Sequence, residues 1–182
     1  SGFVDEENRQ SSITPTLNSL NLTLNGEVYV SGTTISEVGH YSITVTGING
    51  YSNTFTFTVS EFIPELNSTI LFIGETLATI QNVQSVELDG LEYISEDLIT
   101  EIGTHTITVY GLNGYTNSYT FDIQPVINGF NDGDEFTGGY VSFNVDNTDN
   151  VFVNGESYIN NTNLFDIGYY TVLVTGSNDY EY

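Results

Sequence analysis

The chain has 182 residues and a formal net charge of −23, because 24 acidic residues stand against a single basic one, Arg9. This composition excludes nucleic-acid binding, which depends on clusters of Lys and Arg that neutralise phosphate charge, and anionic membrane surfaces would repel the chain for the same reason. The sequence contains no Cys, so disulfides, zinc–thiolate sites and cysteine nucleophiles are excluded as well.

A segment of fifteen residues is written three times along the chain. It reads EVGHYSITVTGINGY at 37–51, EIGTHTITVYGLNGY at 101–115 and, altered, DIGYYTVLVTGSNDY at 166–180. Self-similarity at a fixed period, here 64 or 65 residues, indicates tandem copies of one structural unit. We therefore divide the chain into a first repeat (1–60), a second repeat (61–124) and a third repeat (125–182).

Each repeat reads as a series of short β-strands. In the first repeat, SITVTG and TFTFTVS alternate large apolar residues with Thr or Ser, which is typical of half-buried antiparallel strands. Upstream of them, further short strands are predicted at 11–17, 20–30 and 33–38. The equivalent segments lie at 76–80, 85–94, 97–102 and 107–123 in the second repeat, and at 140–145, 150–159, 163–167 and 171–176 in the third.

Asn-Gly and Asp-Gly pairs mark the tight turns between these strands. The pairs at 25–26, 89–90 and 154–155 predict one hairpin in each repeat, because these residues tolerate positive φ angles. A second hairpin is predicted at Asn49-Gly50 and again at Asn113-Gly114. In the third repeat the glycine is replaced by Asp179, which tolerates such angles less well, so we expect a looser turn there.

The pattern predicts an all-β protein. No segment shows helical periodicity, and many short strands separated by turn residues are typical of β-sandwiches. We expect three antiparallel sandwiches arranged end to end, stiffened at their joints by Pro64 and Pro125. Each repeat is near the size at which folding buries only about 60% of the surface of the unfolded chain, so contacts between neighbours are expected to matter.

The stretch EVGHYSI at 37–43 resembles the tyrosine corner of the immunoglobulin fold, in which an acid, a Gly and a Tyr precede a buried residue of one strand. The resemblance implies that the phenols of Tyr41 and Tyr170 hydrogen-bond backwards to the chain. The second repeat departs from this pattern, because His105 could make the bond only through a ring nitrogen, and its corner is expected to be weaker. The corner glycines are Gly39, Gly103 and Gly168.

The repeat as a whole is similar to the tandem bacterial immunoglobulin-like repeats of surface and secreted proteins. The resemblance implies a non-catalytic, extracellular structural or adhesive module, a stalk or filament segment of a larger protein on a cell surface, virion or appendage. The chain shows no signal peptide or starting Met and reads as a piece of something longer. The alternative is a carbohydrate-binding accessory region of a secreted enzyme, with a protein or glycan partner still to be identified.

The sequence shows no catalytic machinery. His40 and His105 are the only histidines and occupy non-equivalent positions, so a structural role is expected for each. No Ser, His and Asp converge in the sequence as a hydrolytic triad. The acids at 37, 101 and 166 recur in register, and we interpret them as groups that shape the Gly turn rather than as a repeated ligand.

Two ligand-binding hypotheses remain open, one for calcium and one for sugars, and each has a purely structural alternative. Asp122, Asp132 and Asp134 carry the hard oxygen atoms that Ca²⁺ prefers, but the segments that hold them also read as turns. No other cofactor is indicated. Exposed aromatics beside Asn and Asp can stack on sugars, yet aromatics equally fill the core of small sandwiches. The candidates for sugar stacking are Tyr140, Tyr169 and Tyr180.

The third repeat lacks most of the last strand that the other two carry as TFTFTVS and SYTFDIQ. One interpretation is that the sequence stops before the native strand does. The other is strand addition, in which a neighbouring subunit supplies the missing strand and links copies head to tail.

Overall fold

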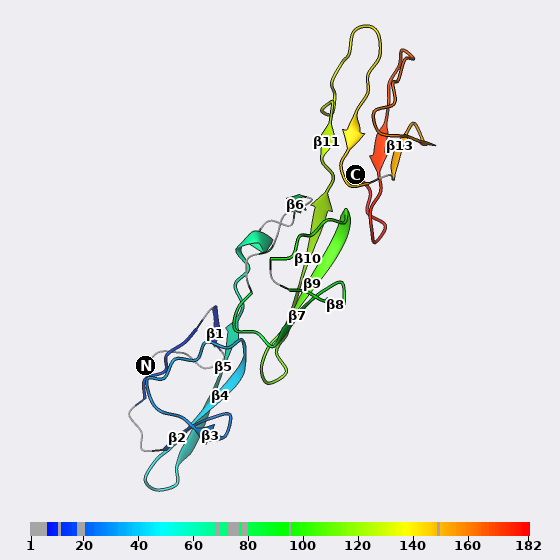
Figure 1. Cartoon of the computed structure of the whole chain (residues 1–182). Helices are drawn as coiled ribbons and strands as arrows, with labels where there is room; N and C mark the ends of the chain where they lie inside the picture. Colours follow the sequence, from blue (N-terminus) through cyan, green and yellow to red (C-terminus); the bar gives the residue numbers. More distant parts are fainter. Residues whose placement is uncertain are drawn as a thin grey trace. The chain divides into compact units, whose positions relative to one another are not determined.

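The computed structural model describes residues 7–10, 12–17, 21–67, 70–72, 77, 80–94, 96–148 and 150–182. Within these ranges the chain is all-β, as the sequence predicts (Figure 1). It consists of short strands and one 3₁₀ turn, η1 (Pro64–Asn67), without an α-helix in the described part. None of the helical structure described here is long and apolar enough to cross a membrane.

The first repeat forms a five-stranded sheet in the order β1-β5-β4-β2-β3. Its strands are β1 (Glu7–Gln10), β2 (Asn21–Leu24), β3 (Glu27–Val28), β4 (Gly39–Thr46) and β5 (Ser52–Ser60). The alternation of the sequence sets the two faces of β4 and β5. Ile43 and Phe57 point into the core and are at most 2% exposed, whereas Thr44 and Thr54 share a hydrogen bond of 2.8 Å on the outer face.

The second repeat repeats this topology in a sheet of the order β6-β10-β9-β7-β8. Its strands are β6 (Ile70–Phe72), β7 (Ser85–Leu88), β8 (Leu91–Glu92), β9 (Gly103–Tyr110) and β10 (Thr116–Gln124). Position for position, the apolar alternation of β9 and β10 matches that of β4 and β5. The same local pattern therefore produces the same strand order twice.

The edges of these two sheets differ from the wholly antiparallel arrangement that the sequence predicts. β1 pairs with β5 in parallel, and β6 pairs with β10 in parallel. The reason is that β5 and β10 would otherwise leave an open row of N–H and C=O groups, and a short segment from earlier in the chain covers that edge. The pairs β2-β3, β2-β4 and β4-β5 of the first sheet and β7-β8 and β7-β9 of the second are antiparallel.

The second layer of the first repeat is much thinner than the sequence predicts. In the described residues, the segments 12–17 and 33–38 pair at one antiparallel bridge, where Ile13 and Ile35 exchange hydrogen bonds of 2.8 and 2.9 Å, and the hydroxyls of Thr14 and Thr34 lie 3.0 Å apart. Pro15 has no N–H to extend the ladder, although its carbonyl accepts a bond from Gly32. Both isoleucines belong to the core that the sheet covers. The equivalent segment 76–80 of the second repeat lies largely outside the described residues.

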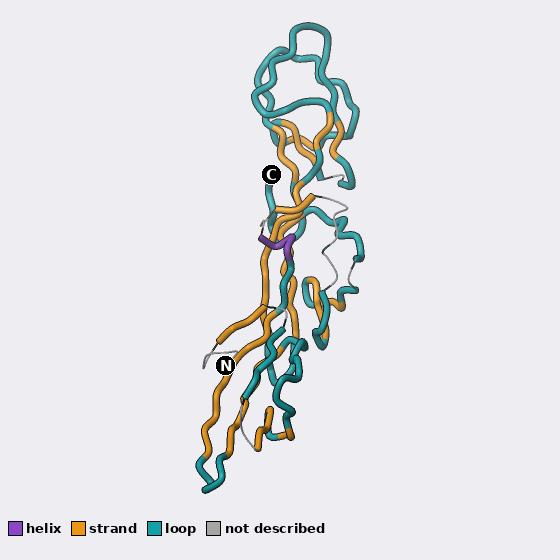
Figure 2. Tube along the Cα trace, turned by 90° about the vertical axis from the view of Figure 1, so that its left-hand side faces the viewer, coloured by secondary structure: helices purple, strands orange, loops and turns teal. Residues whose placement is uncertain are grey.

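The third repeat has less regular structure than the other two. A two-stranded sheet pairs β11 (Ile127–Asn128) with β12 (Asn144–Val145), and a long loop joins them (Figures 1 and 2). A three-stranded sheet has the order β14-β13-β15. Its strands are β13 (Val151–Val153), β14 (Glu156–Ser157) and β15 (Val172–Val174). The strands predicted at 140–145 and 163–167 shrink to β12 and a single bridge between Val141 and Leu164.

The last residues of the chain begin to pair with β15. Val174 and Tyr182 exchange main-chain hydrogen bonds of 2.9 and 3.0 Å, and Thr175 bridges Glu181. β15 has three residues, against eight in β4 and eight in β9. Strand addition by a second subunit at this edge stays a prediction.

The tight turns are formed as predicted at the three upstream hairpins and at Asn113-Gly114, but the later hairpins of the first and third repeats differ from expectation. Asn25, Asp89 and Asn154 have φ angles of 50–51° and are each followed by a Gly with positive φ. In the later hairpin of the first repeat, Gly50 has a positive φ but Asn49 does not. The expectation of a looser turn in the third repeat is wrong. There Asn178 and Asp179 adopt φ angles of 56° and 58°, much like Asn113 and Gly114 at 57° and 77°.

The chain divides into two compact units, and their boundary runs through the second repeat. Unit 1 takes the described residues of Ser1–Pro64, Ala78–Ser95 and Ile107–Tyr119, and unit 2 takes those of Glu65–Leu77, Glu96–Thr106 and Thr120–Tyr182. Each unit therefore packs part of the second repeat against a neighbouring repeat. The end-to-end arrangement of three sandwiches stays a prediction.

Candidate functional site: two docked turns

In unit 1, the turn of the second repeat (residues 111–115) lies on the corner of the first repeat (residues 38–40). The N–H of Leu112 donates to the carbonyl of Val38 at 2.8 Å, and the N–H of His40 donates to the carbonyl of Leu112 at 3.2 Å. Gly39 and Leu112 thereby form a parallel bridge. The side-chain amide of Asn113 adds a bond of 2.7 Å to the carbonyl of His40. The turn thus satisfies main-chain groups at the start of β4 that would otherwise need water.

Apolar contacts reinforce this docked turn. Val38 is only 2% exposed, and Leu112 packs against the core of the first repeat. The ring of His40 meets the ring of Tyr115 edge-on, with centroids 5.2 Å apart. Burial of Val38 alone is expected to contribute on the order of 1.5–3 kcal/mol, the usual range for an aliphatic side chain.

The closest approach between turn and corner requires glycine on both sides. A Cβ added to Gly39 would lie 2.8 Å from the carbonyl oxygen of Leu112. A Cβ added to Gly111 would lie 2.5 Å from the carbonyl oxygen of Val38. Both distances are well inside van der Waals contact, so any larger residue would push the turn away.

Unit 2 contains the same contact in the same register. Ser177, which is equivalent to Leu112, donates from its N–H to the carbonyl of Ile102 at 2.8 Å and forms a parallel bridge with Gly103. The side-chain amide of Asn178 donates to the carbonyl of Thr104 at 2.6 Å. Ile102 is 3% exposed, and a Cβ on Gly103 would lie 2.7 Å from Ser177. The chain therefore builds one joint twice.

The joint in unit 1 also contains a buried carboxylate. Glu61 is 3% exposed and accepts hydrogen bonds from the phenols of Tyr115 at 2.7 Å and Tyr119 at 2.8 Å. The amide of Asn117 donates a third bond to it, at 2.8 Å. A buried carboxylate is costly unless its oxygens are hydrogen-bonded, and these three donors offset that cost.

The phenols around Glu61 hold their protons tightly. Burial raises the pKa of Tyr119 to about 12, and its hydrogen bond to the Glu61 carboxylate adds to the effect. The pKa of Tyr115 is raised further for the same reasons, with burial again the larger cause. In unit 2, burial and the nearby charge of Asp122 raise the pKa of Tyr180, the residue equivalent to Tyr115. Each joint therefore contains a protonated tyrosine close to an acid.

The hydrogen bond expected of a tyrosine corner is present in all three repeats. The phenol of Tyr41 donates to the carbonyl of Glu37 at 2.7 Å, and that of Tyr170 donates to the carbonyl of Asp166 at 2.6 Å. His105 makes the same contact through Nε2, which lies 2.9 Å from the carbonyl oxygen of Glu101. In each repeat, the recurring acid accepts this hydrogen bond through its main-chain carbonyl. In the first and second repeats, this bond holds the corner on which the docked turn lies.

A second set of tyrosines escaped the sequence analysis. The phenol of Tyr29 donates to the carbonyl of Thr33, and that of Tyr158 donates to the carbonyl of Thr162 at 2.8 Å. Both side chains are buried. The signal was available, since Tyr29, Tyr93 and Tyr158 recur at the period of the repeat.

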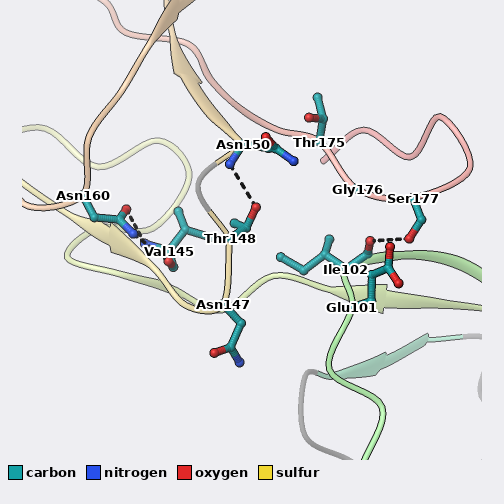
Figure 3. Close-up of a pocket in the computed structure, with 10 residues that line it drawn as sticks. All are labelled: Glu101, Ile102, Val145, Asn147, Thr148, Asn150, Asn160, Thr175, Gly176 and Ser177. Carbon is teal, nitrogen blue, oxygen red and sulfur yellow. Dashed lines mark hydrogen bonds between the residues drawn. The ribbon is translucent and has the colours of Figure 1, made fainter.

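Beside the docked turn of unit 2 lies a polar pocket of about 620 Å³ (Figure 3). Its lining includes Asn147, Asn150 and Asn160, together with the backbone of the joint at Ile102 and Ser177. Asn160 is tied in place by two bonds of 2.9 Å to the main chain of Val145. The pocket offers amides and carbonyls but no aromatic ring among its lining residues, so it lacks the stacking platform of a typical sugar site.

The calcium hypothesis finds no clustered site. In the described part of the chain, no three groups of the metal-ligating types come together. Asp122 accepts a hydrogen bond from Thr104 at 2.7 Å. Asp134 accepts one from the N–H of Asn131 at 2.7 Å, as expected of a turn. The structure therefore does not gather Asp122, Asp132 and Asp134 around one point.

The aromatic candidates fall into two classes. Tyr140 is 58% exposed and lies beside the exposed ring of Phe165, with centroids 5.8 Å apart. Tyr169 is fully exposed, whereas Tyr180 is partly buried against the core of the third repeat. Tyr140 and Tyr169 thus remain available to a partner, and Tyr180 contributes to the fold.

Sequence reasoning missed the joints themselves, for reasons that differ from residue to residue. Asn113 and Asn178 recur at the period, but so does Asn49, which docks on nothing in the described chain, so the spacing alone reveals only a turn. Glu61 does not recur, because Pro125 stands at the equivalent position, at the start of the third repeat. Its role depends on tyrosines more than fifty residues away, which no local pattern indicates.

Comparisons with known proteins assign the chain to no family. No family model matches it, and no curated protein is similar to it in sequence. Among solved structures, it is similar at 14% identity and a TM-score of 0.28 to SGBP-B of the mixed-linkage glucan utilization locus of Bacteroides ovatus, in complex with a mixed-linkage heptasaccharide. The match covers 97% of this chain and spans 60% of that one. A likeness this distant leaves fold and function to the contacts of the chain itself.

Proposed function

We propose that this chain is a non-catalytic, extracellular structural module, a stalk or adhesive segment built from immunoglobulin-like repeats that dock on one another. The observation that carries the proposal is the repeated joint, in which a Gly-x-Asn turn lies on a Val-Gly or Ile-Gly corner. A chain whose joints are held by hydrogen bonds and buried apolar residues resists bending better than one whose domains are connected by a free linker.

Composition supports an exposed location for such a module. With 24 acidic residues and a single basic one, its surface is strongly negative, which keeps a protein soluble and limits non-specific contacts. The fold reaches stability without disulfides by sharing buried residues across its joints. In unit 1, these shared residues are Val38, Leu112 and Glu61.

The proposal is tested by opening one joint without disturbing the repeat that carries it. Gly39→Val places a side chain against the Leu112 carbonyl, whereas Gly168→Val, at the equivalent position of the third repeat, meets no atom within 4 Å of the added Cβ. In single-molecule stretching, we expect Gly39→Val to weaken the resistance of the first joint and Gly168→Val to leave every internal step unchanged. Equal traces for Gly39→Val and the unsubstituted chain would refute a load-carrying joint.

Carbohydrate binding is the second candidate, favoured by the exposed pair of Tyr140 and Phe165. Two adjacent exposed rings are the feature with which sugar-binding modules stack on pyranose faces. On a glycan array, Tyr140→Ala and Phe165→Ala should each abolish any binding. Phe136→Ala is the control, since Phe136 is similarly exposed at 53% and lies outside the pair. Binding that survives both substitutions, or no binding by the unsubstituted chain, would rule this candidate out.

A further inference from the structure

The corner of the third repeat has the residues of the two docked corners but carries no docked turn in the described chain. Ile167 is equivalent to Val38 and Ile102, which are 2% and 3% exposed, yet it is fully exposed at 105%. Its neighbour Tyr169 is also fully exposed, at 102%. An apolar side chain that is buried in two copies and fully exposed in the third indicates a contact surface that is still open.

The backbone at this open corner has the space that a turn would need. A Cβ added to Gly168 would meet no atom within 4 Å, whereas at Gly39 and Gly103 it would lie 2.8 and 2.7 Å from the docked turn. The corner itself is formed, because Tyr170 makes its bond to the carbonyl of Asp166. The surface is therefore shaped like the other two corners before anything covers it.

The complementary element, the turn of the first repeat, is undocked in the described chain. The turn of the first repeat, residues 47–51, exposes Ile48 at 88% and Tyr51 at 73%. Their equivalents in the second repeat are covered, since Leu112 packs against the core of the first repeat and Tyr115 is 6% exposed. The described chain thus presents one unoccupied corner and one undocked turn.

We propose that the turn 47–51 of one chain docks on the corner 166–169 of a second copy of this chain. The proposal rests on the proposed function, because it uses the joint that the chain already forms twice. By equivalence with the first joint, the N–H of Ile48 donates to the carbonyl of Ile167, and the amide of Asn49 donates to the carbonyl of Tyr169. Ile48 and Ile167 are then buried against each other.

Charge sets the conditions under which this contact forms. The turn 47–51 contains no charged residue, so it brings no like charge against Asp166 at the corner. Two chains of formal charge −23 nevertheless repel each other at a distance. Raising NaCl from about 0.1 M to about 1 M shortens the Debye length from about 10 Å to about 3 Å and should strengthen the association.

The turn itself provides a local readout. In both docked turns the Asn has a positive φ, 57° at Asn113 and 56° at Asn178, whereas Asn49 of the undocked turn does not. Docking should therefore convert Asn49 to the left-handed conformation while its side chain gains a carbonyl partner. The amide resonance of Asn49 is expected to shift with protein concentration and with salt.

The experiment is sedimentation of the full 182-residue chain over a range of concentrations, at low and high salt. The unsubstituted chain should form head-to-tail oligomers that grow with concentration and salt. Gly168→Val blocks the corner, and Ile48→Asp places a charge on the turn, so each variant alone should stay monomeric. In an equimolar mixture, the Ile48→Asp chain keeps an unsubstituted corner and the Gly168→Val chain keeps an unsubstituted turn. The mixture should therefore form dimers but nothing larger.

Two results would overturn the proposal. One is a monomeric unsubstituted chain at high concentration and high salt. The other is that Gly168→Val and Ile48→Asp associate as strongly as Thr137→Val, a control substitution at an exposed site outside the corner. Strand addition would also give this second result. Amide exchange at Leu112 and Ser177, measured on the same samples, reports the internal joints. Protected amides without association would reject this inference alone, and unprotected amides would reject the proposed function.

Discussion

The phenol of Tyr115 donates a hydrogen bond of 2.7 Å to the carboxylate of Glu61, 54 residues earlier in the chain. Glu61 follows directly on β5, and Tyr115 ends the turn that lies on the first repeat. The bond therefore fastens the docked turn from one side, while the bridge between Gly39 and Leu112 fastens it from the other. Removing either member should loosen the joint.

Glu61→Ala should lower the free energy of unfolding of unit 1 by about 2–4 kcal/mol, because it removes the acceptor of both phenols and one of the two acceptors of the Asn117 amide. Glu61→Gln keeps one acceptor oxygen and should cost roughly half as much. Urea unfolding followed by circular dichroism measures both losses. The matched control is Glu92→Ala, at an exposed position of β8. A loss no greater than that of the control would mean that the carboxylate does not hold the joint.

Alkaline pH should open the same joint. The pKa of Tyr119 is raised to about 12, and that of Tyr115 is raised as well, so the folded chain holds these protons more tightly than the unfolded chain does. The stabilisation is fully present below a pH of about 10, the ordinary pKa of tyrosine, and is lost as the pH rises through about 12. Phenolate absorbance should show Tyr115 and Tyr119 among the late-titrating tyrosines, together with Tyr180.

The comparison for this titration is Glu61→Gln. It removes the hydrogen-bonded negative charge but leaves the burial, so Tyr115 and Tyr119 should titrate at lower pH without becoming ordinary. An unchanged titration in the variant would mean that burial alone raises both pKa values.

The tyrosine corner offers a matched pair of substitutions. Tyr41→Phe removes the bond to the Glu37 carbonyl from a side chain that is 6% exposed, and should destabilise the first repeat by about 1 kcal/mol or somewhat more. Tyr170→Phe removes the equivalent bond at the open corner, where water can replace it, and should cost a few tenths of a kcal/mol. Thermal unfolding of the two variants, compared side by side, tests the ranking. Equal losses would show that burial does not control the strength of the corner.

How much of this structure the sequence predicts depends on how local each feature is. The strands β4 and β9, the turns at Asn25 and Asn154 and the hydrogen bond of Tyr41 are encoded within a few residues, and the pattern predicts them. The parallel pairing of β1 with β5 joins Glu7 to Phe57, and nothing in either segment specifies that partner. Long-range pairings of this kind escape periodicity, which describes only one strand at a time.

The docked turns are a second feature that the local sequence pattern does not predict. Asn49 and Asn113 occupy equivalent positions in nearly identical turns, GINGY and GLNGY. Only the second turn has its Asn at a positive φ with its amide on a neighbouring carbonyl. The difference lies in what each turn contacts, since the turn of the second repeat meets a corner and that of the first meets none in the described chain. Contact with a neighbour, rather than propensity, decides the conformation.

That contrast leads to the last prediction, which compares substitutions of the two asparagines. Asn113→Ala loses the bond to the His40 carbonyl and also places Ala at a φ of 57°, so it should destabilise unit 1 by about 2 kcal/mol. Asn113→Gly loses the bond but accepts the angle, and should cost about 1 kcal/mol. Asn49→Ala, in the undocked turn without a positive φ, should cost only a few tenths. Amide exchange at Leu112 should accelerate in the same order across the three variants. If Asn49→Ala accelerated that amide as much as Asn113→Ala, the left-handed asparagine would not be what fixes the docked turn.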